Sequence, residues 1–226
     1  DLTLPEAAVQ GPVYVTAGDD SGYELVLHRA LGRPVVEGMR FGALPLAQRW
    51  AEARGRPIVI LGTEEGNREL FPRQSVDPTV QATLEEWFGG EDCGVVPTKF
   101  APDTLALLLV PDRDVLLKRR IEDDEADQRL TEGVLGLARQ FTARFEEGPA
   151  ARMFVNLDAP VIGELLAAPE SRATPGAAIL RAFAEASGQR AGSLSEEGAT
   201  RDLGEVLAAL NAGVRALVDP GASTPG

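Results

Sequence analysis

The chain has 226 residues, of which 44% are hydrophobic and 25% are charged. This composition is typical of a globular protein and excludes a largely disordered chain, and the length suffices for one large domain or two small ones. Acidic residues outnumber basic ones by 35 to 22, which gives a formal net charge of -13. Because such a charge repels a phosphate backbone and no local cluster of Lys and Arg opposes it, the sequence argues against nucleic acid as a partner.

The single cysteine, Cys93, excludes an internal disulfide and a multi-cysteine zinc site, so we expect a protein of the reducing cytoplasm. The longest apolar run, residues 105–110, falls short of the about 18 residues that cross a bilayer, so we expect no membrane segment. The chain begins with Asp1, and no basic-then-apolar signal precedes the first expected strand. We interpret the chain as a fragment or processed piece of a longer protein.

The first part of the chain alternates short apolar runs with helical patterns. Strands are expected at residues 13–15, 34–36 and 58–61, and helices at residues 21–31 and 42–54. This order is a βαβαβ unit of the α/β class, and strands that are apolar on both sides favour a parallel sheet covered by helices. The segment 62–78 is polar, contains Gly and Pro, and lacks a sustained period. We interpret it as a boundary that closes a first domain at residues 1–76.

Residues 77–220 are expected to form a smaller α+β domain ending in dimerising helices, and residues 221–226 a flexible tail. Asp77 and Pro78 suit the start of a helix that continues to Phe88. Two strands, at residues 95–100 and 105–110, are expected to form a hairpin-like element. The other expected elements are a long helix at 123–147, a short strand at 153–155 leading into 160–168, and helices near 177–186 and 203–218.

A pair of acids, Asp19 and Asp20, follows the first expected strand, where paired acids bind magnesium in phosphotransfer receivers. A receiver also needs a phosphate-accepting Asp after the third strand, and here glycine and threonine follow it. More simply, Asp20 or Ser21 caps the next helix. Our alternative hypothesis is an independent α/β enzyme or ligand-binding domain that uses Asp19 and Asp20 at the sheet edge, with an oligomerisation module behind it.

The residues that usually perform catalysis are scarce. His28 is the only histidine and Cys93 the only cysteine, so Ser-His or Cys-His catalysis and imidazole-rich metal sites lack partners. A glycine-rich phosphate-binding motif is also absent from the strand-to-helix turns. Metal binding through carboxylates alone stays open, although we interpret the acidic run at 122–125 as a solvated helix start. We therefore expect no catalytic, cofactor-binding or metal-binding residue in this chain.

The last expected helix places six apolar residues on one stripe: Leu203, Val206, Leu207, Leu210, Val214 and Leu217. Such a stripe packs either on the preceding helix of the same chain or on a second copy, where two helix pairs complete a four-helix bundle. The pattern does not choose between these packings. The second one predicts a homodimer.

Several local patterns resemble, in chain order, the heat-shock protein 90 family of chaperones, whose bacterial member is the high-temperature protein G. The strand VYVT at 13–16, followed by a helix and by RPVV at 33–36, is similar to the last α/β segment of that family's middle domain. TLEEWFG at 83–89 followed by CGVV at 93–96 resembles the family's first C-terminal helix and strand. FVNLDAPVI at 154–162 resembles the strand, turn and helix start before the dimerising helices, although its turn departs from the usual Asn-Pro followed by His.

This resemblance implies that the chain is the C-terminal scaffold and homodimerisation part of an ATP-dependent molecular chaperone that assists protein folding under stress. ATP and magnesium would bind an N-terminal domain that precedes Asp1, so this chain would not itself be an enzyme. Its expected partners are a second copy and unfolded client proteins. The expected client contacts are Trp87 and Phe88 on one helix, and the segment Val115, Leu116, Leu117 and Ile121, for which core packing is the alternative.

Overall fold

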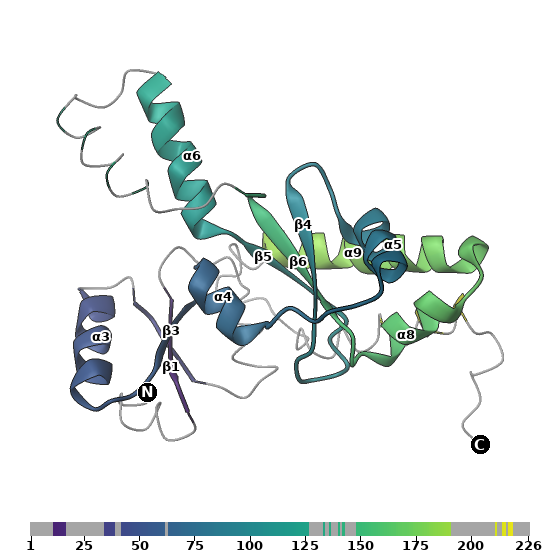
Figure 1. Ribbon diagram of the computed structural model, residues 1–226, viewed down its shortest axis with the longest axis horizontal. Helices are drawn as coiled ribbons and strands as arrows, with labels where there is room; N and C mark the ends of the chain where they lie inside the picture. Colours follow the sequence, from purple (N-terminus) through teal and green to yellow (C-terminus); the bar gives the residue numbers. More distant parts are fainter. Residues whose placement is uncertain are drawn as a thin grey trace.

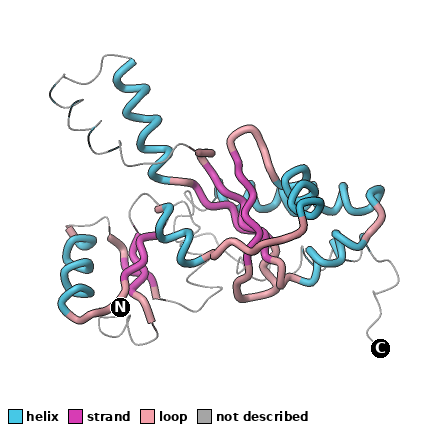
Figure 2. The backbone as a smooth tube through the Cα atoms, in the orientation of Figure 1, coloured by secondary structure: helices cyan, strands magenta, loops and turns pink. Residues whose placement is uncertain are grey.

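The computed structural model describes residues 11–16, 34–38, 42–61, 63–126 and 148–190, together with single helical positions at 133, 136, 140, 142, 211, 214, 215, 217 and 218. These residues form two small sheets and the helices around them, which is a mixed α/β architecture (Figures 1 and 2). The expected helix at 21–31 and most of those at 123–147 and 203–218 lie outside the described residues. None of the described helices is both long and apolar enough to cross a membrane.

The first sheet is parallel, with the strand order β2-β1-β3. It contains β1 (Val13–Thr16), β2 (Val35–Val36) and β3 (Ile58–Leu61), and α3 (Ala43–Ala53) precedes β3. Val13, Val15 and Ala47 form a small core between β1 and α3 because their side chains point to the face that the helix covers. The three strands and the helix before β3 are confirmed, as is the parallel sheet.

A short helix, α4 (Glu64–Leu70), lies in the segment that we expected to be a boundary without regular structure. Thr63 caps it, since its Oγ1 accepts a hydrogen bond from the Gly66 amide at 3.2 Å. A side chain at position 66 would not fit, because a Cβ there would lie 2.1 Å from the carbonyl oxygen of Ile60. The helix is therefore packed tightly against the end of β3.

The second sheet is mixed, with the strand order β4-β6-β5. Following α5 (Pro78–Phe88), it contains β4 (Cys93–Thr98), β5 (Leu107–Pro111) and β6 (Ala151–Asn156). β6 pairs in parallel with β4 and antiparallel with β5. The expected hairpin is wrong, because β6 lies between the two strands that we expected to pair. Its residues Met153, Phe154 and Val155 are all buried, as is typical of a central strand with both faces covered.

The remaining helices are α6 (Arg113–Ala126), α8 (Pro160–Ala167) and α9 (Glu170–Arg190). α6 follows β5 directly and extends away from both sheets (Figure 1). The helix expected near 177–186 is confirmed and is longer than expected, since α9 includes Pro175 in its interior.

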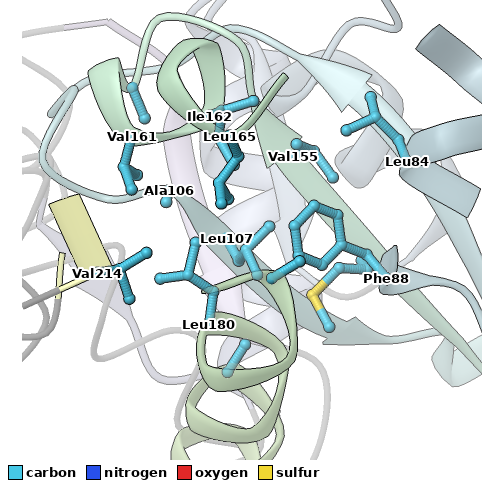
Figure 3. Packing of buried hydrophobic residues seen from close by; sticks show 14 of the residues in the cluster. Leu84, Phe88, Ala106, Leu107, Val155, Val161, Ile162, Leu165, Leu180 and Val214 are labelled. Atoms are coloured by element: carbon cyan, nitrogen blue, oxygen red, sulfur yellow. The ribbon is translucent and has the colours of Figure 1, made fainter. Parts of the chain in front are cut away.

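Two larger hydrophobic clusters hold the elements together. In the main cluster, α5, α8 and α9 pack on the second sheet through residues such as Leu84, Phe88 and Leu165 (Figure 3). The other cluster joins the two sheets: Phe71, which follows α4, stacks 4.5 Å from the ring of Phe154 on β6. The sheets therefore share a hydrophobic cluster across the boundary expected at residues 76 and 77.

Candidate binding groove between α5, α8 and α9

A groove of about 450 Å3 lies between α5 on one side and α8 with the start of α9 on the other. This volume is within the about 300–1,000 Å3 of typical ligand sites. Its lining residues come from these three helices and the connection between α8 and α9: Thr79, Val80, Thr83, Glu86, Trp87, Leu165, Leu166, Ala168, Glu170, Ala173 and Thr174. The groove is a candidate binding site in the described part of the chain.

The helical periodicity of α5 determines which of its side chains face the groove. Leu84 and Phe88 are fully buried in the main cluster, so the face that carries Val80, Thr83 and Trp87 is turned toward the groove. Asp77 fixes the start of the helix by accepting a hydrogen bond from the Thr79 amide at 2.8 Å. That hydrogen bond lowers the pKa of the Asp77 carboxyl below its usual value. The cap thus remains ionised and bonded at neutral pH.

The opposite wall is backed by the main cluster. Leu165 is fully buried and Leu166 is half-buried beside it. Behind Leu165, a Cβ at Gly176 would lie 2.8 Å from the Leu165 side chain, 3.3 Å from Val218 and 3.4 Å from Val214. Because these atoms are already close-packed, Leu165 has little room to move deeper into the core. This side of the groove is therefore backed by closely packed core residues.

The chemistry that the groove offers is apolar surface, hydroxyl groups and carboxylates. Val80, Trp87 and Leu166 supply half-buried apolar atoms. Glu86 and Glu170 are exposed, one on each wall. These groups suit the binding of a ligand that has an apolar part, with Trp87 as the largest contact.

The predicted client contacts do not form one surface. Trp87 lines the groove, whereas Phe88 and Val115 are buried and inaccessible to a client in this arrangement. Leu116 and Leu117, on α6, are 43% and 40% exposed, and Ile121 is half-buried. Since α6 rises at the other end of the second sheet from α5 and α8, its leucines are remote from the groove (Figure 1). For Val115, the structure favours the core alternative.

Of the residues predicted for the dimer interface, Leu203, Val206, Leu207 and Leu210 lie outside the described residues. Val214 is only 2% exposed and packs in the main cluster beside Leu180 (Figure 3), where a second copy would not reach it. Leu217 is 45% exposed. Arg215 joins this segment to α8, since its guanidinium lies 2.9 Å from the Glu164 carboxylate.

The acids of the alternative hypothesis, Asp19 and Asp20, also lie outside the described residues. At the described part of that sheet edge, Thr16 accepts a hydrogen bond from the Gly38 amide at 3.1 Å. A Cβ at Gly38 would lie 2.1 Å from the carbonyl oxygen of Thr16, so backbone fills the space here. Among the residues that the structure describes, no group of three or more His, Cys, Asp or Glu is arranged to hold a metal ion. Cys93 is half-buried, and this burial raises the pKa of its thiol.

Sequence reasoning missed a buried ion pair near the junction of the sheets. The Asp112 carboxylate is 1% exposed and lies 3.1 Å from the guanidinium of Arg152. The same guanidinium lies 3.9 Å from Glu64 at the start of α4. No periodic signal marks these positions, because they meet only when β5, β6 and α4 are assembled. The contacts link the two sheets and are structural.

The chain was compared with family models, curated proteins and solved structures, and it matches none of them.

Proposed function

We propose that this chain is a protein-binding scaffold that receives an apolar side chain of a partner polypeptide in the groove between α5, α8 and α9. The observation that carries the proposal is the position of Trp87, half-buried on a wall that the core already holds in place. Tryptophan is enriched among the residues that dominate protein interfaces, since its ring covers a large area at low cost in side-chain entropy.

A preformed groove also favours binding energetically. Partners that need no rearrangement lose less free energy to ordering when they associate. Here Leu84 and Phe88 anchor one wall, and Leu165 anchors the other. The groove can thus accept a partner side chain without disturbing the packing beneath it.

In its narrower form, the proposal makes the partner an unfolded client and the chain the non-enzymatic C-terminal scaffold of a chaperone similar to heat-shock protein 90, with ATP bound elsewhere. The sequence resemblance supports this form. Homodimerisation through the stripe that includes Leu217 belongs to the same form.

The proposal is tested by the aggregation of a purified, heat-unfolded client such as citrate synthase in the presence of the full chain. We expect the wild type to suppress light scattering, and Trp87→Ala and Leu166→Ala to lose most of this effect, since both remove apolar surface from the groove. Leu46→Ala is the matched control, because Leu46 lies on α3 and is 65% exposed. Equal suppression by Trp87→Ala and by the wild type, with both folded by circular dichroism, would refute the proposal.

A further inference from the structure

We infer that the groove selects a cationic, amphipathic polypeptide segment, with its apolar side chains against Trp87 and its basic side chains at the two rims. This inference rests on the proposed function and specifies the chemistry of the partner. It follows from the charges around the groove rather than from its apolar floor.

The two walls each end in a carboxylate. Glu86 lies on the exposed side of α5 next to Trp87, and Glu170 is the first residue of α9. Among the described residues that line the groove, none is basic. Arg172 is near in sequence, but its guanidinium donates to the carbonyl oxygen of Val218 at 3.0 Å. Among the described lining residues, no basic side chain therefore neutralises the two carboxylates, and only the start of α9 offsets the charge of Glu170 in part.

The position of Glu86 on its helix adds to the negative potential. It lies in the last turn of α5, which ends at Phe88. The carbonyl end of a helix carries a partial negative charge, so a carboxylate there lacks the favourable dipole that it would have at the other end. A cation supplied by a partner would interact with both the carboxylate and the helix end.

The whole chain reinforces this preference, since its net charge is -13. A field of this sign speeds the approach of basic segments and slows that of acidic ones. The Thr83 hydroxyl donates to the carbonyl oxygen of Thr79 at 2.9 Å and can still accept a hydrogen bond, and Thr174 adds a second hydroxyl on the other wall. A partner segment with an apolar side chain flanked by Lys or Arg can thus contact Trp87 and the two rim carboxylates at the same time.

The test uses the full chain and two labelled peptides of equal length, one alternating Leu with Lys and one alternating Leu with Glu, followed by fluorescence anisotropy. We expect the Lys peptide to bind, the Glu peptide not to bind, and the affinity to fall when NaCl rises from about 20 mM to about 300 mM. Replacing both rim acids, by Glu86→Gln and Glu170→Gln, should lower the affinity for the Lys peptide by about tenfold. Trp87→Ala should lower it by at least about tenfold.

Glu69→Gln on α4 is the matched control, since it removes an exposed charge outside the groove. If it weakens binding of the Lys peptide as much as replacing both rim acids does, the attraction is nonspecific and the inference is overturned. If the two peptides bind equally and Trp87→Ala abolishes both, charge selection fails while the proposed function stands. If Trp87→Ala changes neither peptide binding nor client aggregation, both fail.

Discussion

Asn156 is a buried side chain whose amide uses both of its ends. Its Nδ2 donates to the carbonyl oxygens of Phe100 at 2.8 Å and Leu105 at 3.0 Å. Its Oδ1 accepts from the backbone amides of Phe100 at 3.3 Å and Asp158 at 3.2 Å. The side chain thus fixes the loop between β4 and β5 against the end of β6. β6 lies between these two strands, which we had expected to form a hairpin.

We predict that Asn156→Ala lowers the free energy of unfolding by about 3 kcal/mol, because it leaves several buried backbone groups without partners. The measurement is urea denaturation. Lys99→Ala is the control in the same loop: its ion pair with Asp158, at 2.9 Å, is about half exposed and should contribute less than about 1 kcal/mol. If the two variants were equally stable, Asn156 would not hold the loop.

At the scale of elements, the ion pair between Asp112 and Arg152 joins the end of β5 to β6. Asp112 also accepts a hydrogen bond from the Val115 amide at 3.2 Å, which places it at the start of α6. Since the carboxylate is almost wholly buried, its charge depends on Arg152 for compensation. Asp112 therefore connects the sheet to α6, and its partner Arg152 extends the contact to Glu64 at the start of α4.

We predict that Arg152→Met destabilises the chain by about 3 kcal/mol, because it leaves a buried carboxylate without its cation. Adding Asp112→Asn should recover more than half of that loss, since the amide oxygen can still accept from Val115 while the charge is gone. A double-mutant cycle by urea denaturation measures this coupling. Strictly additive losses would show that the two residues act independently.

Elements with strong local signals were predictable from the sequence. The apolar run at Ile58–Leu61 and the Asp77-Pro78 start of α5 both act within a few residues, and the structure confirms them. The insertion of β6 between β4 and β5 depends on pairing between distant segments, for which the sequence has no local marker. α6 was also not predicted as a helix, because its many charged residues leave no clear apolar periodicity.

The candidate site was predictable only on one side. Trp87 stood out as a large aromatic residue on an expected helix. The opposite wall comes from Leu165, Leu166 and the start of α9, far along the chain. Only tertiary packing brings the two walls together, so no spacing in the sequence reveals the groove.

At the scale of the whole molecule, two residues of the apolar stripe near the end of the chain differ in exposure. Val214 is buried in the main cluster, whereas Leu217 is 45% exposed. An intramolecular contact and a dimer contact therefore require different residues of the same stripe. This separation allows folding and association to be tested independently.

We predict that Val214→Ala lowers the free energy of unfolding by about 2 kcal/mol without changing the molecular mass in light scattering, since it leaves a cavity in the core. Leu217→Asp should convert a dimer to a folded monomer at little cost in stability, because it places a charge on the exposed side of the stripe. A wild type that is already monomeric, or a Leu217→Asp variant that stays dimeric, would contradict the proposed interface.

The central claim is that a partner polypeptide occupies the groove, and site-specific photocrosslinking tests it most directly. A photoreactive amino acid replaces Thr83 inside the groove or, as the matched control, Glu69 on α4, and a purified unfolded client is added before irradiation. We predict that the client crosslinks from position 83 and that unlabelled Lys-Leu peptide competes with it, while position 69 gives a background signal. Equal crosslinking from both positions, or none from position 83, would contradict the claim.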